Sequence, residues 1–339
     1  MKNRSAFILF LSLLVAKSFL GFSQDLHFSQ YFSAPMILNP ALAGQFDGTF
    51  RYTNIYKSQW NSISQNAYRT YATSIDGVLY KSNVFGGISF FRDKAGDSKM
   101  GTTDINATIA SRIRLNNTNS ITAGFQIGVL QNSIDFSDLT WNNQIDGKIF
   151  NTDIDSKEFN SSYKKNNLNI AAGMYWKSVI NDYAKFNLGF STYHLNTITL
   201  SYYNTDNILN RRFCLHGGLE LTQRNTNVTY MPSFMILKQG SANEYNLGLI
   251  VKYQLGMTSK YTGAKVSSDV FFGAFTRFND AFILYTRFLY KNRISMGLSY
   301  DVNFSTLKTV SHTRGGTEVS LIYIFNVKRV SVKLVDPSH

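Results

Sequence analysis

Cysteine and proline are both scarce in this sequence of 339 residues. The single cysteine, Cys214, excludes an internal disulfide framework, and we expect it to pack as a small apolar side chain. Only four prolines occur, and two of them, Pro35 and Pro40, precede the first segment with strand character. Because proline cannot donate to a sheet ladder, its near absence afterwards is typical of long, uninterrupted strands.

Long apolar runs are missing after residue 24. A membrane-spanning helix requires about 20 such residues, so helical membrane proteins are excluded for that part of the chain. The amino terminus has a shorter run over residues 6–16, which follows two basic residues and ends before Lys17. A basic start, an apolar core and small residues near position 23 predict a secretory signal peptide over residues 1–23.

Clustered catalytic and metal-binding residues are also lacking. The five histidines lie far apart in the sequence, without the spacing of a zinc site. No nucleophile elbow accompanies His194, so a serine hydrolase arrangement is not indicated. We therefore predict a protein that is not an enzyme and that has no metal site and no cofactor.

What the sequence does contain is strict alternation. In residues 293–304 every even position is apolar and every odd position is polar or glycine. Strand side chains alternate between two faces, so this segment predicts a strand with one apolar and one polar face. Twelve residues at about 3.3 Å each are long enough to cross a bilayer at a tilt of about 45°.

The pattern recurs along the chain with small or charged residues on the polar face. A soluble sandwich also alternates, but such a polar face suits a water-filled lumen better than a soluble core. An exported chain that crosses a membrane by strands must close its sheet, because open edges leave backbone groups unpaired in hydrocarbon. We predict an all-β fold, an antiparallel transmembrane outer-membrane β-barrel of about 14 strands, over residues 46–58, 67–80, 83–92, 101–115, 118–133, 166–180, 183–196, 210–223, 226–238, 243–257, 267–278, 281–290, 293–304 and 314–327.

The connections between these strands divide by length. An even strand number places both chain ends on the periplasmic side and puts the long connections, 134–165, 197–209 and 305–313, on one side, predicted to be the cell surface. Loop 134–165 carries acidic residues and apolar anchors, and loops of this length are usually functional or disordered. We therefore predict a partner-binding extracellular loop with the candidate residues Trp141, Gln144, Asp146 and Phe150.

Two end segments flank the predicted barrel, which spans residues 46–327. Residues 24–45 are rich in aromatic residues and interrupted by proline, which disfavours a transmembrane strand. We predict an ordered, plug-like periplasmic segment that packs in the base of the barrel. Residues 328–339 are predicted to form a periplasmic tail.

Charged residues at lumenal positions of the strands are a further candidate site. We expect them either to form a web of ion pairs inside the barrel or to line a path for a ligand or peptide, and we expect His194 to hydrogen-bond in the same interior or at its rim. The net charge is +13, or +10 without the three basic residues of the signal peptide. Because these basic residues are scattered singly, we expect a basic lumen, contact with anionic membrane lipid or an acidic partner, and no nucleic acid. The lumenal candidates are Arg112, Arg114, Arg277, Arg287, Asp301 and Glu318.

An ordered set of short motifs resembles the PorP/SprF family, membrane proteins of the type IX secretion system. The set begins with H-F-S-Q-Y-F-S-A-P-M-I-L-N-P-A-L-A-G from residue 27 and spans nearly the whole mature chain. The carboxy-terminal stretch after Phe325 is longer than this family pattern. The other motifs are L-T-W at 139–141, Q-I-D at 144–146, L-G-F-S at 188–191, H-L at 194–195, M-P-S-F at 231–234, S-Y-D at 299–301 and G-G-T-E-V-S at 315–320.

The resemblance implies a noncatalytic barrel in the outer membrane of a Gram-negative bacterium. It implies assistance in the secretion or surface anchoring of a cognate adhesin, including adhesins of gliding motility, by binding the carboxy-terminal signal domain of that protein. Other outer-membrane or periplasmic components of the type IX system are further expected partners. Two alternatives remain open: a channel for small solutes, and a core type IX component that contacts the periplasmic motor assembly.

Overall fold

The computed structural model describes most of the chain after the expected signal peptide. The described residues are 25, 27–59, 68–80, 83–96, 100–135, 144–146, 149–150, 154, 163–200, 207–255, 268–305 and 313–326. The expected signal peptide and the expected tail 328–339 lie outside them. Within these ranges no helix is both long and apolar enough to cross a membrane.

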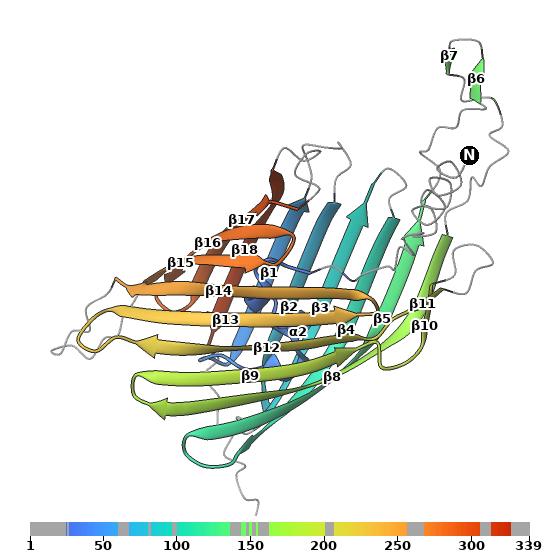
Figure 1. The fold of residues 1–339 in the computed structure, drawn as a ribbon. Helices are drawn as coiled ribbons and strands as arrows, with labels where there is room; N and C mark the ends of the chain where they lie inside the picture. The colour runs from blue at the N-terminus through green and yellow to red at the C-terminus, as the bar shows by residue number, and fades with distance from the viewer. Residues whose placement is uncertain are drawn as a thin grey trace, which may run out of the picture.

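Fourteen antiparallel strands form a closed barrel, as predicted (Figure 1). Each strand pairs with its neighbours in chain order, and the first strand pairs with the last to close the sheet. The strands are β1 (Phe50–Gln59), β2 (Tyr68–Tyr80), β3 (Val84–Ala95), β4 (Met100–Arg114), β5 (Asn119–Ile134), β8 (Tyr163–Asn181), β9 (Ala184–Tyr193), β12 (Arg212–Thr222), β13 (Val228–Gln239), β14 (Ala242–Gln254), β15 (Asp269–Arg277), β16 (Ala281–Tyr290), β17 (Ile294–Asn303) and β18 (Arg314–Phe325).

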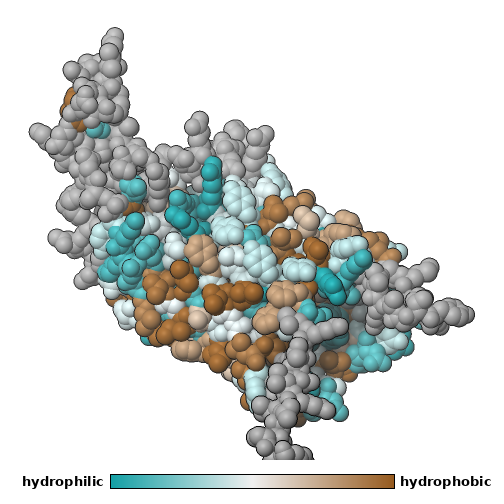
Figure 2. Space-filling view, turned by 180° about the vertical axis from the view of Figure 1, so that it is seen from behind, coloured by the Kyte–Doolittle hydropathy of each residue, from teal (hydrophilic) through white to brown (hydrophobic). Residues whose placement is uncertain are grey.

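Alternation along each strand separates the two faces of the barrel. In β17, Ile294 and Met296 are 40% and 59% exposed on the outside, whereas Ser295 and Ser299 are buried on the inside. The remaining strands alternate in the same way, although β12 to β16 also place apolar residues such as Met235, Ile250 and Phe275 on the inside. Figure 2 shows apolar side chains gathered in a band across the outer surface. An apolar exterior around a polar interior is the inverse of a soluble core, and it confirms the predicted fold class.

The two ends of the barrel differ in the length of the connections between strands. The long-loop end, where β1, β3, β5, β9, β13, β15 and β17 finish, carries two small hairpins, β6 (Ile145–Asp146) with β7 (Ile149–Phe150) and β10 (Ile198–Leu200) with β11 (Asn207–Leu209). At the opposite end, Lys291 and Asn292 adopt positive φ in the tight turn after β16. The connection between β14 and β15 is the longer exception at that end.

Two strand boundaries differ from the prediction. β1 begins at Phe50 rather than at residue 46, because the ladder with β18 starts at the pair Phe50 and Phe325. β8 begins at Tyr163, inside the predicted loop 134–165, because β5 continues to pair with it as far as Ile134. The ladder therefore shortens the predicted loop by three residues at its carboxy-terminal end.

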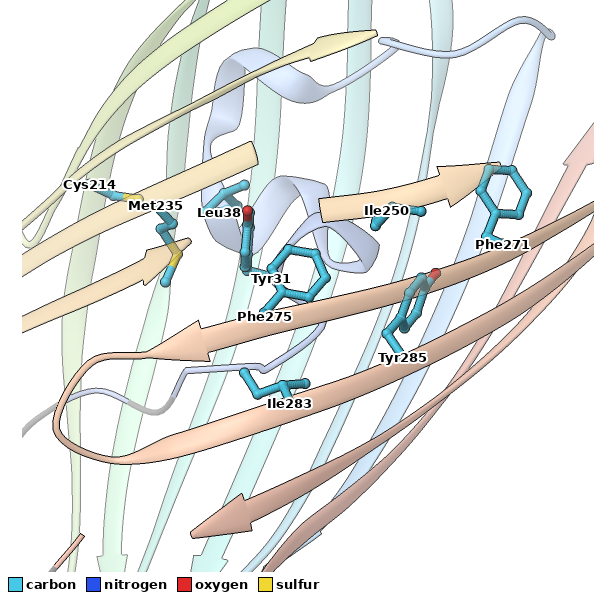
Figure 3. Packing of buried hydrophobic residues seen from close by; sticks show 9 residues of the cluster. All are labelled: Tyr31, Leu38, Cys214, Met235, Ile250, Phe271, Phe275, Ile283 and Tyr285. Atoms are coloured by element: carbon cyan, nitrogen blue, oxygen red, sulfur yellow. The ribbon is translucent and has the colours of Figure 1, made fainter. Parts of the chain in front are cut away.

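Residues 27–45 lie inside the barrel as three short helical turns. These are η1 (Tyr31–Ser33), α2 (Pro35–Leu38) and η2 (Pro40–Leu42). Proline begins α2 and η2, where its missing N–H costs no hydrogen bond. Figure 3 shows Tyr31 and Leu38 of this lumenal segment among side chains of the wall, including Cys214, which is buried in this cluster.

Candidate functional site

The lumenal segment is held at the long-loop end by a buried ionic network. The backbone N–H groups of Ser29 and Gln30 donate to the two carboxylate oxygens of Glu318 at 2.7 and 2.9 Å. Lys57 lies with its ammonium 3.3 Å from the same carboxylate and donates to the backbone oxygen of His27 at 2.8 Å. Lys57 and Glu318 are 1% and 0% exposed, so each charge depends on the other for compensation.

A second carboxylate extends this network. Asp301 lies 3.0 Å from Arg277 and accepts a hydrogen bond of 2.6 Å from the Ser29 hydroxyl. Arg277 also donates to Asp280 at 2.5 Å and to the Ser29 hydroxyl at 3.2 Å. Strands β1, β15, β17 and β18 are thus tied to one short stretch of the segment, which we call the Glu318 network: Ser29, Gln30, Lys57, Arg277, Asp301 and Glu318.

Asp25 makes a separate contact at the same end. Its carboxylate lies 2.6 Å from His194 Nε2 and 3.2 Å from Arg212. Burial by itself would raise the pKa of Asp25, but His194 and Arg212 together hold that pKa well below its usual range. The Nδ1 atom of His194 faces Asn169 at 3.0 Å, so the histidine hydrogen-bonds inside the barrel as expected.

The far end of the segment is bound near the opposite end of the barrel. The N–H of Gly44 donates to Asp76 at 2.7 Å, and Asp76 forms a two-point ion pair with Arg51. Arg112 donates to the backbone oxygen of Gly44 at 3.1 Å and to the Gln45 side chain at 3.0 Å. The segment therefore runs along the lumen from the long-loop end to the start of β1. The prediction places it only in the base of the barrel.

Lumenal glycines allow the middle of the segment to touch the wall. A Cβ atom at Gly124 would lie 2.7 Å from the Cα of Ala41 and closer still to its peptide nitrogen. A Cβ at Gly173 would overlap the side-chain oxygen of Asn39. Asn39 in turn donates to the Met174 backbone oxygen at 3.0 Å. Gly124 must lack a side chain because backbone meets backbone there, and Gly173 leaves the space that the Asn39 side chain occupies.

His27 gives the segment a dependence on pH. Its Nδ1 lies 3.1 Å from Glu244, yet burial, with the charges of Arg277, Lys57 and Arg212, lowers the pKa of His27 well below its ordinary value. His27 is therefore neutral beside Glu244. Since the undocked segment binds this proton more readily, the contribution of His27 favours docking above pH of about 6.5 and is lost as pH falls below it.

We expect amide exchange of residues 27–45 to be faster at pH 5 than at pH 7.5 after correction for the intrinsic rate. Hydrogen–deuterium exchange with mass spectrometry measures this. His27→Gln has no ionisable side chain at this position and should remove most of the pH difference. Slower corrected exchange at pH 5 would show that protonated His27 is instead favoured beside Glu244.

The predicted lumenal residues occupy two places. Arg277, Asp301 and Glu318 meet in the Glu318 network. Arg112 binds the far end of the segment, and Arg114 lies beside it in a cavity at the opposite rim. Arg287 stacks on the Phe271 ring at 3.8 Å and lines another lumenal cavity.

The predicted loop residues are less fully described. Gln144 donates to the backbone oxygen of Ile154 at 3.0 Å. Asp146 and Phe150 belong to the β6–β7 hairpin, in which Ile145 pairs with Phe150. Trp141 lies outside the described residues, so the role of this group stays a prediction.

Sequence reasoning missed several residues that hold the segment. Lys57, Asp76 and Arg212 occupy inward positions of alternating strands, and that signal was available in the sequence. Asp25, Ser29 and Gln30 had no such signal, because they lie outside the strands. Within the described ranges, no group of three or more His, Cys, Asp or Glu residues is placed to hold a metal ion.

Solved structures with a similar fold are outer-membrane channel barrels. The Ralstonia pickettii toluene transporter TbuX aligns with a TM-score of 0.52 at 9% identity, covering 87% of this chain and 94% of that one. The CymD monoaromatic hydrocarbon channel aligns at 0.47 with 10% identity over 88% and 94%, and the KdgM porin at 0.38 with 10% identity over 81% and 99%. At these identities the likeness concerns the fold alone.

Sequence comparison is more specific. No curated protein matches the chain. The family profile described as "Type IX secretion system membrane protein PorP/SprF" matches residues 20–323. This range includes the whole lumenal segment and every strand of the barrel except the end of β18. Residues of the motifs that begin at 27, 299 and 315 meet in the Glu318 network. The chain belongs to the PorP/SprF family of type IX secretion system membrane proteins.

Proposed function

We propose that this barrel is a noncatalytic partner of a secreted adhesin in the outer membrane of a Gram-negative bacterium. It binds the carboxy-terminal signal domain of that adhesin and assists its secretion or its anchoring at the cell surface. Family membership supports the link to type IX secretion. The apolar exterior and the similarity in fold to outer-membrane barrels support the location.

The filled lumen is the observation that carries the proposal. A barrel of about fourteen strands has an interior wider than side chains alone fill, and it leaks unless it is plugged. Here residues 27–45 contact the wall from the Glu318 network at one end to Asp76 at the other. A barrel closed by its own chain supports a receptor or anchor better than a pore for free diffusion.

Co-purification tests the proposal directly. The native barrel is extracted in mild detergent from cells that express the candidate adhesin, and bound proteins are identified by mass spectrometry. We expect a protein with a type IX carboxy-terminal signal to be recovered, and its signal domain alone to compete for the barrel. Recovery of the barrel alone, with the adhesin present, would refute the proposal.

Trp141→Ala should release the adhesin without unfolding the barrel. A buried aromatic anchor at an interface is worth about 2 kcal/mol or more, which is roughly a thirtyfold loss of affinity. The matched control is Trp176→Ala, which removes an exposed tryptophan from the outer face of β8. If loop 134–165 only seals its own barrel, Trp141→Ala will instead raise conductance and leave adhesin display intact.

A channel for small solutes is the second candidate, because space remains beside the segment. One lumenal cavity of about 240 Å³ is lined by residues that include Phe32, Met231 and Arg287, and another of about 390 Å³ lies at the opposite rim. TbuX, which shares the fold, is a toluene transporter. A large, steady current through the native protein in a planar bilayer would favour the channel over the plugged anchor.

A further inference from the structure

A partly enclosed cavity near the long-loop end lies beside the lumenal segment and shares Asp25, His194 and Arg212 with the contacts that hold it. It measures about 80 Å³ and lies between that segment, strands β3, β4 and β5, and the β10–β11 hairpin. Since a cavity of about 10–15 Å³ already holds a single water, this cavity has room for a small organic group. Leu200 and Leu209 of the hairpin line it from the side of the loops.

Two carboxylates line this cavity without a basic partner. Asp93 of β3 accepts a hydrogen bond from Thr70 at 2.8 Å, and Asp104 of β4 accepts one from Asn169 at 3.0 Å. Among the described residues, neither has a lysine, arginine or histidine within 4.0 Å. The register pairs Asp93 with Thr102, so the two aspartates are diagonal cross-strand neighbours, typically about 7–8 Å apart.

The basic groups that line the cavity already have a carboxylate partner, although the Nε of Arg212 is buried without a hydrogen-bond partner. Arg212 and His194 both pair with Asp25, and Arg212 also stacks on the Tyr193 ring at 4.1 Å. Two like charges that face one enclosed space repel each other and are costly to desolvate without a counter-charge. The lining therefore has three carboxylates beside Arg212 and His194, and among the described residues Asp93 and Asp104 have no ion-pair partner within 4.0 Å.

Unsatisfied acceptors indicate a donor ligand. Asn132 is only 6% exposed and lines the cavity, and its side-chain oxygen has no hydrogen-bond partner. The Oδ1 atom of Asp104 is also buried without a partner. Buried polar atoms are nearly always paired, so the free acceptors of Asn132 and Asp104, with the Asp93 carboxylate nearby, fit an ammonium group with three N–H donors.

We propose that this cavity binds a primary alkylammonium group. Asp104 and Asn132 accept its N–H donors, Asp93 supplies the second negative charge, and Phe91, Leu130 and Leu200 contact the alkyl stem. The apolar walls favour an organic cation over a bare metal ion, and the described residues hold no metal-binding group of three or more ligands. The inference does not depend on the adhesin proposal, since a free amine and a lysine side chain share this chemistry.

Isothermal titration of the full-length protein in mild detergent tests the site with defined probes. The probes are 1,5-diaminopentane, the blocked peptide acetyl-Gly-Lys-Gly-amide, glutarate as the anionic counterpart, and calcium chloride. We expect at least one amine probe to bind and glutarate not to bind. Binding of the diamine alone identifies a free amine as the ligand, and binding of the peptide identifies a lysine side chain.

Substitutions then assign the site. Asp104→Asn and Asn132→Ala should each weaken amine binding at least tenfold, whereas Glu220→Gln, at the opposite end of the barrel, should leave it unchanged. Heat-modifiable gel mobility confirms that each variant is assembled, and Asn132→Ala keeps the test valid if Asp104→Asn does not fold. Undiminished amine binding in both variants, binding of neither amine, or binding of calcium alone would overturn the proposal.

Discussion

Glu318→Gln is expected to release the start of the lumenal segment while the barrel stays assembled. The substitution removes the charge that compensates Lys57, which is 1% exposed, and weakens the acceptors for Ser29 and Gln30 N–H. Breaking a buried ion pair by removing one partner costs about 3–5 kcal/mol. Strand pairing of β18 with β1 and β17 does not depend on this side chain. The substitution should therefore destabilise docking of the segment rather than the barrel.

Two measurements follow the release. Amide exchange of residues 27–45 should accelerate by two orders of magnitude or more, and single-channel conductance in a planar bilayer should rise. Thr317→Ala, on the outer face of the neighbouring position, is the matched control and should change neither. The double variant Lys57→Met with Glu318→Gln should recover part of the protection, because no buried charge is then left unpaired.

An unchanged exchange rate in Glu318→Gln would contradict this account. It would show that the contacts at Asp25, Asn39 and Asp76 hold the segment without the Glu318 network. Loss of heat-modifiable mobility would show instead that Glu318 is needed for barrel closure.

Gly124→Leu is expected to displace the middle of the segment from the wall. Even a Cβ at this position would lie 2.7 Å from the Cα of Ala41, and the remaining atoms of leucine have no room beside η2. Overpacking of this kind costs about 1–3 kcal/mol where neighbours can move, and more here because the obstacle is backbone. The segment should yield before the barrel does, since β5 is held by continuous ladders with β4 and β8.

Ala123→Leu is the matched control for this variant. Ala123 is exposed on the outer face one residue away, so the same side chain added there has space. Gly124→Leu should raise conductance and speed amide exchange in residues 36–45, and the control should do neither. An amide exchange rate in Gly124→Leu equal to that of the unsubstituted protein would mean that the strand shifts outward to admit the side chain. The lumenal segment would then stay in place.

The barrel itself was predictable because its signal is local. Alternation in single strands such as residues 293–304 reports which face meets water, and it does so without knowledge of any partner strand. Fourteen such segments, with turn residues such as Lys291 and Asn292 between them, determine strand number and order. The family motifs added the link to type IX secretion, which no periodicity carries.

The site was only partly predictable because its contacts are far apart in the chain. Inward charges such as Arg277, Asp301 and Glu318 could be placed on lumenal faces from their parity. The partners of these charges could not be predicted. Ser29 and Glu318 are separated by 289 positions, and no repeating sequence pattern indicates the hydrogen bond between them. The proline-broken residues 24–45 predicted a non-strand segment but not its path.

By itself, the sequence determined a closed, antiparallel barrel with an apolar exterior, because side-chain alternation and the cost of open edges leave one solution for such strands. Only the tertiary structure decided that the amino-terminal segment fills the lumen along its length. That outcome depends on buried charges such as Lys57 and Glu318 lying beside each other, and on Gly124 and Gly173 leaving space for the backbone of Ala41 and the side chain of Asn39. Both effects exist only once residues hundreds of positions apart are brought to the same place.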